Sequence, residues 1–167
     1  VGQRRYSILK KFKNIKVVAV SDSFLPYRKK FKNGKSFNSY KDMIKNIKTD
    51  IVFICLPNKY ATKATLLALK NEAHVFCEKP PARNFQELGN LGKYLKNFKK
   101  QILVYGFNHR YHDSIIKTKE IIDSKKFGKV INYRGVYGKS YLSPKIVGSI
   151  KQKKDFSWRE RKEDAVS

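Results

Sequence analysis

The tripeptide Glu78-Lys79-Pro80 has the composition and placement of a reaction site. It directly follows the apolar run 73–77 (AHVFC), which has the length and composition of a buried strand. In open α/β sheets, ligands bind at the edge where parallel strands end, and a lysine there can hold a hydroxyl or carry a proton. Because Pro80 and Pro81 stiffen the segment and helical spacing is absent, we favour this interpretation of Lys79 over a surface ion pair.

Three further apolar runs are also followed by polar residues. These residues are Asp22 after run 16–21, Pro57-Asn58 after run 50–56, and Asn108 and Arg110 after run 101–105. An acid about 20 residues after a glycine-rich turn can bind the ribose of an adenosine, and Gly2 lies 20 positions before Asp22. Two alternatives stay open: Asp22 as a turn former or cap, and Pro57-Asn58 as an ordinary strand-to-helix turn.

The segments between these runs have helical periodicity. Helices are predicted over residues 39–47, 60–70, 85–98 and 113–122. Strands that alternate with helices of this length predict βαβ units, hence a Rossmann-type doubly wound parallel sheet with helices on both faces. Residues 130–141 (VINYRGVYGKSY) are aromatic and β-branched, which indicates a strand of a second, mostly antiparallel sheet. We therefore expect two domains, residues 1–126 and residues 127–167.

The composition favours a folded, basic protein. Hydrophobic residues make up 41% of the 167 residues, which argues against global disorder, and no apolar run approaches the length of a membrane span. The net charge is +25, but only eight of the 38 basic residues are arginine and the lysines are scattered. Because arginine dominates specific base and phosphate recognition, we expect weak binding to polyanions and no specific nucleic-acid partner.

The cysteines and histidines do not indicate a metal site. Cys55 and Cys77 lack metal-ligand spacing, and we expect two free, buried thiols in a reducing cytoplasm. His109 and His112 lack an obvious third ligand. The chain begins with Val, and together with the single glycine at Gly2 this suggests that residues 1–167 are a fragment of a longer enzyme.

Five segments resemble the glucose–fructose oxidoreductase / inositol dehydrogenase (Gfo/Idh/MocA) family. The most specific are DIVFICLPN (50–58) and AHVFCEKPPA (73–82), which reproduce the family's strand–PN–helix–strand–EKP order and spacing. GFNHRYH (106–112), FGKVINYRG (127–135) and Trp158-Arg159 match later family segments. The resemblance implies a Rossmann domain followed by a domain with an open sheet. It also implies hydride transfer between NAD(P) and a carbon of a sugar, cyclitol or nucleotide sugar.

The resemblance also implies roles for individual residues. Cofactor-binding residues fall at Gly2, Asp22, Pro57, Asn58, Glu78, Lys79, Asn108 and Arg159. Lys79 falls on the catalytic lysine, and Lys79 with Arg110 on substrate-binding positions. Asp22 favours NAD over NADP because a carboxylate repels a 2′-phosphate, although Arg28 or Lys29 could fold back toward it. The partners expected are a sugar-like substrate and, for the longer protein, further copies of itself.

The chain also departs from the family pattern. The first two glycines of the phosphate-binding turn, the strand before them, and the segment that carries the family's catalytic histidine would lie outside residues 1–167. Members often have glycine near Glu72. We therefore expect residues 1–167 alone to fold poorly and to be inactive. A non-catalytic cofactor-binding regulator of the same fold and, less favoured, a basic nucleic-acid-binding module remain alternatives.

Overall fold

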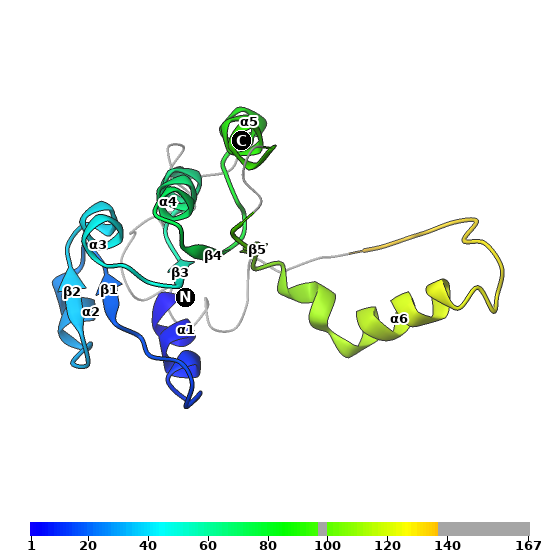
Figure 1. The fold of residues 1–167 in the computed structure, drawn as a ribbon. Coiled ribbons are helices and arrows are strands. Elements are labelled where there is room, and N and C mark those ends of the chain that lie inside the picture. Colours follow the sequence, from blue (N-terminus) through cyan, green and yellow to red (C-terminus); the bar gives the residue numbers. More distant parts are fainter. Residues whose placement is uncertain (97–99, 137–167) are drawn as a thin grey trace, which may run out of the picture. The chain divides into compact units, whose positions relative to one another are not determined.

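The computed structural model describes residues 1–96 and 100–136, drawn as ribbon in Figure 1. The described chain divides after Gly106 into two compact units. The first unit holds ten elements: α1 (Gly2–Leu9), β1 (Ala19–Ser21), α2 (Leu25–Lys29), β2 (Lys35–Phe37), α3 (Tyr40–Asn46), β3 (Ile51–Ile54), α4 (Asn58–Lys70), β4 (His74–Cys77), α5 (Phe85–Lys96) and β5 (Leu103–Tyr105). The domain boundary predicted between residues 126 and 127 stays a prediction.

All five strands pair in parallel, as predicted, and helices alternate with them. β1 pairs with β2, and β3, β4 and β5 form a second sheet in that order. Helices α3 and α5 begin at side-chain caps: Ser39 Oγ accepts from Asp42 N–H at 3.3 Å, and Asn84 Oδ1 accepts from Glu87 N–H at 3.0 Å. The Rossmann-type fold class is therefore confirmed.

The core lies between helix α4 and the sheet β3–β4–β5. Helix α4 presents small side chains, and Ala64 and Ala68 are 0% exposed, so its backbone approaches the strands closely. Val75 and Cys77 on β4 point into this core. Helices α3, α4 and α5 lie side by side on one side of the strands in Figure 1. Phe76, which alternates with these core residues, faces α1 on the opposite side of the sheet.

The predicted single sheet is divided in two among the described residues. No strand of the pair β1–β2 is hydrogen-bonded to β3, β4 or β5. In the strand order of this fold, the first strand lies between the second and the fourth, which correspond here to β1 and β3. The division therefore falls between the two strands that flank the first strand in this order.

Helix α1 and helix α3 link the two sheets. On α1, Arg5 contacts Glu78 beyond β4, and the ring of Tyr6 packs edge-on against Phe31 with centroids 5.4 Å apart. Helix α3 packs against β1 and β2 and also against α4. The sheets are therefore joined by side-chain packing in the part of the chain that the structure describes.

The second unit carries two helical elements among its described residues. They are the 3-10 helix η1 (Asn108–Tyr111) and the helix α6 (Asp113–Asp123), which confirms the helix predicted over 113–122. The strand predicted over residues 130–141 is wrong for residues 130–136, which have no regular structure; its remainder lies outside the described residues. A strand forms only beside a neighbouring strand, and residues 130–136 pair with none in the described chain. Ile131 in this segment is 98% exposed. No helix within residues 1–96 and 100–136 has the length and apolar character needed to cross a membrane.

Candidate cofactor and substrate site

The carboxyl ends of β3, β4 and β5 meet at one edge of their sheet. The N–H of Glu78 donates to the carbonyl of Ile54 at 2.9 Å, and the N–H of Gly106 donates to the carbonyl of Cys77 at 2.8 Å. These bonds align the three strand ends in register. The residues that follow each strand therefore lie next to one another, which is the arrangement predicted for Asn58, Glu78 and Lys79.

Asn58 is the first residue of α4, and Pro57 is its N-cap residue. Asn58 is only 6% exposed as a residue, but none of its side-chain atoms is among the fully buried polar atoms that lack a hydrogen bond in the described chain. What suits its amide to meet a ligand is therefore its position at the start of α4, directly after β3. Pro57 also ends β3, because it cannot donate to the sheet. Pro57-Asn58 is thus also the strand-to-helix turn considered as its alternative role, with Pro57 at the cap position.

Glu78 is held by Arg5 of α1. Arg5 Nε donates to Glu78 Oε1 at 2.7 Å, and Arg5 Nη2 contacts the same oxygen. The Arg5 guanidinium also lies over the Phe76 ring, 5.1 Å from its centroid. A Cβ placed on Gly106 would lie 3.2 Å from Glu78 Oε2, so the glycine leaves room for this carboxylate. Glu78 is thus oriented by Arg5, which packs on Phe76 of β4, in the space that Gly106 leaves open.

Lys79 differs from Glu78 in having no fixed partner. Its side chain is exposed and forms no hydrogen bond or ion pair with a described residue. The Lys79–Pro80 peptide bond is cis. Thr62 on α4 donates from its hydroxyl to the carbonyl of Pro81 at 3.1 Å, which ties the segment after Lys79 to the start of that helix. The ammonium group of Lys79 is therefore available to a ligand at this edge.

Asp22 follows β1 at the carboxyl end of the other sheet. Its Oδ1 accepts a hydrogen bond from the N–H of Phe24 at 2.8 Å. This bond closes a turn, so Asp22 has the turn-forming role that was considered as its alternative. Arg28 folds back toward this turn and donates from Nη1 to the carbonyl of Asp22 at 2.6 Å. The first residue of α1, Gly2, lies near Cys55 at the end of β3: a Cβ on Gly2 would be 3.5 Å from Cys55 Cβ.

Two cysteines lie under the site as free thiols. Cys77 is buried and Cys55 is half-buried, which corrects the prediction that both are buried. Burial, reinforced by the Glu78 carboxylate, raises the pKa of Cys55 to about 11. Burial also raises the pKa of Cys77 to about 11. Both thiols are therefore protonated at neutral pH and act as apolar packing groups. No cluster of His, Cys, Asp or Glu in the described chain is arranged to hold a metal ion.

Three predicted site residues lie outside the described residues of the first unit. Asn108 and Arg110 are exposed residues of η1, which belongs to the second unit, and Arg159 lies outside the described residues. Their roles remain predictions. Conversely, sequence reasoning missed Arg5 and its bond to Glu78. No local sequence pattern indicated this contact, because Arg5 and Glu78 are 73 positions apart.

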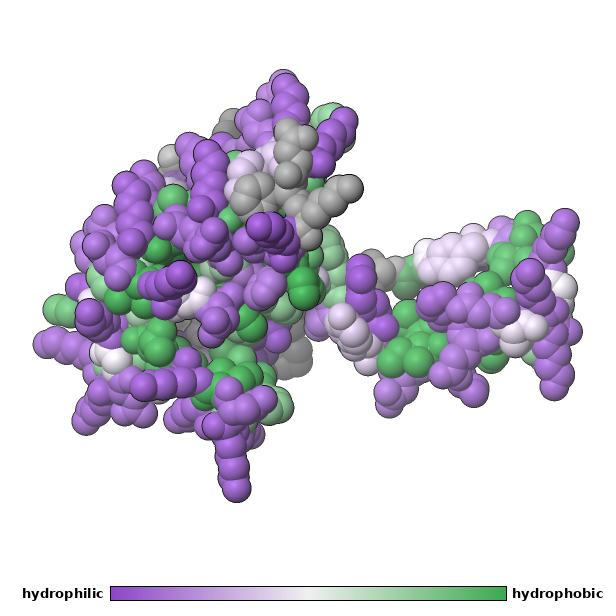
Figure 2. Space-filling model, viewed as in Figure 1, coloured by the Kyte–Doolittle hydropathy of each residue, from purple (hydrophilic) through white to green (hydrophobic). Residues whose placement is uncertain are grey.

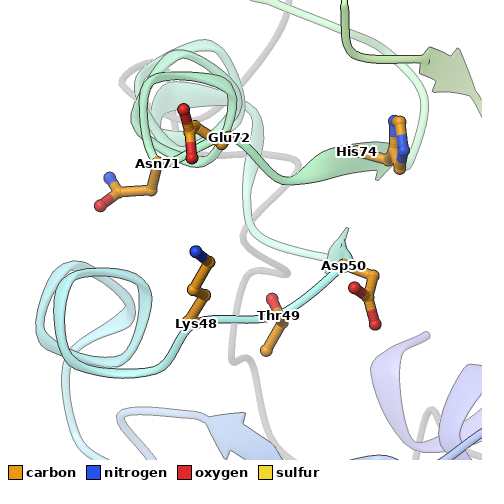
Figure 3. Close-up of a pocket in the computed structure, with 6 residues that line it drawn as sticks. All are labelled: Lys48, Thr49, Asp50, Asn71, Glu72 and His74. Atoms are coloured by element: carbon orange, nitrogen blue, oxygen red, sulfur yellow. The ribbon is translucent and has the colours of Figure 1, made fainter.

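A polar hollow of about 340 Å³ lies at the opposite edge of the same sheet (Figure 3). It is lined by residues that precede β3 and β4 or end α4, namely Lys48, Thr49, Asp50, Asn71, Glu72 and His74. In Figure 3 the Lys48 side chain reaches toward Asn71 and Glu72. Because ligands of open α/β sheets bind at the carboxyl ends of the strands, this hollow is not the cofactor site.

These features define a Rossmann dinucleotide-binding domain with an acid after one strand, and an asparagine and a lysine after two others. Residues 1–107 match the family described as oxidoreductase family, NAD-binding Rossmann fold (GFO_IDH_MocA). The chain belongs to this family, and the predicted resemblance and the NAD-binding class of the domain are confirmed.

Individual relatives are dehydrogenases of sugar-like compounds. The chain is 29% identical to D-glucoside 3-dehydrogenase of Escherichia coli over 70% of its own length and 34% of the relative's. It is 29% identical to myo-inositol 2-dehydrogenase of Thermotoga maritima over 57% of its length and 28% of the relative's. The crystal structure of myo-inositol 2-dehydrogenase from Lactobacillus plantarum superimposes with a TM-score of 0.69 at 29% identity, over 78% of this chain and 40% of that one. The chain therefore spans roughly a third of the length of the relatives it matches.

Proposed function

We propose that the protein transfers a hydride between NAD(P) and a hydroxyl-bearing carbon of a sugar, cyclitol or nucleotide sugar. The observation that carries this proposal is the adjacency of Asn58, Glu78 and Lys79 at one sheet edge, joined by the bonds between the strand ends. The amide of Asn58, at the start of α4 beside the strand ends, fits a cofactor that lies along the start of that helix. The exposed ammonium of Lys79 fits a substrate hydroxyl.

Lys79 is the proposed catalytic residue. When bound, the oxidised nicotinamide accepts the hydride. Lys79 Nζ hydrogen-bonds the substrate hydroxyl and orients the carbon that gives up its hydrogen. As C–OH becomes C=O, Lys79 gives one of its protons to water and takes up the proton of the hydroxyl, so the net proton leaves to solvent. Glu78 cannot swing toward Lys79 without leaving Arg5, so the Arg5 contact keeps the lysine available. Asn58 and Asp22 hold the two ends of the cofactor.

The substrate class rests on the names of the relatives. Both relatives compared above are dehydrogenases of polyhydroxylated rings, one of a glucoside and one of an inositol. We extend this class to the present protein, with Arg110 as a substrate-binding residue and Asn108 and Arg159 as cofactor-binding residues. A cytoplasmic location and assembly of several copies belong to the same proposal.

A specific nucleic-acid partner is not part of this proposal. Hydrophilic side chains spread over the face of the first unit seen in Figure 2, interrupted by smaller apolar patches. Lysines occur on α3, α4 and α5 alike, so the positive charge is distributed over the elements and not gathered on one. Such a surface supports weak, salt-sensitive binding to polyanions.

The test is NAD(P)-dependent turnover by the protein as the cell makes it, on a panel of glucosides and inositols. Lys79→Met, which keeps the length of the side chain and removes the charge, should lower kcat by about 10²–10⁴-fold. NAD affinity should change by less than about threefold, because Lys79 acts at the hydride end of the site. Lys45→Met, at an exposed position of α3, is the matched control. NAD binding without turnover of any substrate would instead favour the non-catalytic regulator, and near-normal kcat in Lys79→Met would remove Lys79 from the mechanism.

A further inference from the structure

We propose that Arg28 is a second specificity-determining residue for the adenosine end of the cofactor, and that it allows the site to accept a 2′-phosphate beside Asp22. The inference rests on the proposed function, because it takes the cofactor to bind with its adenosine ribose at Asp22. A role for Arg28 changes the expected selectivity between NAD and NADP. Asp22 alone predicts NAD, whereas Asp22 with Arg28 predicts that NAD and NADP both bind.

The position of Arg28 is fixed by three acceptors. Its Nη1 donates to the carbonyl of Asp22 at 2.6 Å, to the carbonyl of Ser23 at 3.2 Å and to Asn38 Oδ1 at 2.8 Å. Asn38 directly follows β2, and Asp22 directly follows β1, so the guanidinium spans the carboxyl ends of both strands. A side chain held at three points keeps its place without a ligand, and little ordering remains to be done on binding.

The other donors of Arg28 have no partner in the described chain. All three bonds use Nη1, so Nη2 and Nε donate to none of the described residues. No carboxylate in that part of the chain forms an ion pair with the guanidinium, and its acceptors are two carbonyls and an amide. Arg28 thus presents a half-buried, uncompensated positive charge with two unused donor positions. A phosphate matches that geometry through paired N–H···O bonds.

Asp22 keeps its own role beside this group. Its Oδ1 is occupied by the N–H of Phe24, and its Oδ2 accepts no hydrogen bond from a described residue, so one oxygen is available to the ribose hydroxyls. A carboxylate in this position repels a 2′-phosphate. The charge of Arg28, bonded to the backbone of the same residue, offsets that repulsion. The ribose site therefore pairs one acceptor with one cation.

The test compares NAD⁺ and NADP⁺, which differ only in the 2′-phosphate, by calorimetric titration of the protein as the cell makes it, without substrate. We expect the two Kd values to lie within about tenfold of each other. Arg28→Gln keeps amide donors for the carbonyls of the turn but removes the charge. It should raise the Kd for NADP⁺ at least tenfold, in line with the loss of a charge-assisted bond, and the Kd for NAD⁺ less than threefold. Lys45→Gln removes the same charge from an exposed site on α3 and should leave the ratio of the two Kd values unchanged.

The ratio of the two Kd values separates specificity from general damage to the turn. If Arg28→Gln only loosened the loop, both Kd values would rise together, and an unchanged ratio overturns the inference. Binding of NAD⁺ with NADP⁺ more than about 100-fold weaker in the unmodified protein overturns it as well and leaves the proposed function standing. Binding of neither dinucleotide overturns the proposed function itself, and the role of Arg28 with it.

Discussion

Arg5 and Glu78 lie 73 positions apart in the sequence and are joined by a 2.7 Å hydrogen bond from Arg5 Nε to Glu78 Oε1. The side chain of Glu78 is 16% exposed and that of Arg5 is 32% exposed, so the pair is partly shielded from water. The bond connects helix α1 to the end of β4. It also separates the carboxylate of Glu78 from the neighbouring Lys79, which the proposed reaction requires to be available.

Removing Arg5 should destabilise the first unit. Arg5→Met leaves the Glu78 carboxylate without its partner in a partly buried position, and loss of one member of a buried pair is costly. Because both side chains retain some exposure, we expect a loss of about 1–2 kcal/mol in the free energy of unfolding, less than for a fully buried pair. Denaturant unfolding measures it. The double variant Arg5→Met/Glu78→Gln should recover part of the loss, and purely additive single effects would contradict the pairing.

Glu72→Gly should stabilise the protein. Glu72 follows the end of α4 with φ of 64°, in the left-handed region that glycine adopts without strain. Replacing it with glycine relieves about 1 kcal/mol of backbone strain, of which part is offset by the greater entropy of an unfolded glycine. We expect a net gain of about 0.5 kcal/mol by thermal or denaturant unfolding. Glu72→Ala removes the same charge but keeps a Cβ, so a gain as large in that variant would show that charge, and not backbone conformation, is responsible.

Gly106→Ala and Gly89→Ala should have opposite effects on stability. A Cβ on Gly106 meets Glu78 Oε2 and Phe76 Cζ at 3.2 Å, so the carboxylate or the ring must shift, and we expect a loss of about 1 kcal/mol. A Cβ on Gly89 meets nothing within 4 Å, and the residue lies inside α5. Alanine there should add about 0.5–1 kcal/mol, because it is the better helix former. Equal changes in the free energy of unfolding of the two variants would show that the structure accommodates a Cβ at Gly106 without cost.

The thiols should give the protein a defined sensitivity to alkali. In the folded state the pKa of Cys55 is about 11, above its ordinary value of 9.0. The unfolded chain then loses this proton at lower pH than the folded chain does. The contribution of the protonated Cys55 thiol to the free energy of unfolding is therefore complete below pH 9, and it is lost as the pH rises from 9 to about 11.

Iodoacetamide labelling followed by mass spectrometry measures this shift. Since the thiolate is the reactive form, Cys55 in the folded protein should react about 100-fold more slowly at pH 8 than in urea, as two pKa units imply. Its reaction rate should keep rising up to about pH 11. Equal rates in the folded and unfolded protein would contradict the burial of Cys55.

The strands of the core sheet could be predicted from the sequence because their composition is determined by burial. The runs DIVFICL and AHVFC are continuous and apolar, as expected for strands covered on both faces, and they contain β3 and β4. The short strand β2 (KSF) is mostly exposed and has no such signal, so it was not predicted. Helix α1 was missed for the same reason, since none of its residues is buried.

The placement of the candidate site residues could be predicted where it follows from position along a strand, and not where it depends on long-range contacts. Asn58 and Lys79 directly follow apolar runs, so the topology of a parallel sheet places them at one edge. The contact between Arg5 and Glu78 depends on how α1 packs against β4, which no local pattern encodes. The sequence left open whether Arg28 reaches Asp22, because that depends on the conformation of the turn and not on its composition.

The division of the described strands into two sheets affects how rigidly the dinucleotide site is built. Asp22 belongs to one sheet and Asn58 to the other, and the links between these sheets are side chains on α1 and the packing of α3. Side-chain contacts yield more easily than a ladder of backbone hydrogen bonds. In the described chain, the adenosine end and the hydride end of the site are thus joined by side-chain packing and not by a shared ladder of backbone hydrogen bonds.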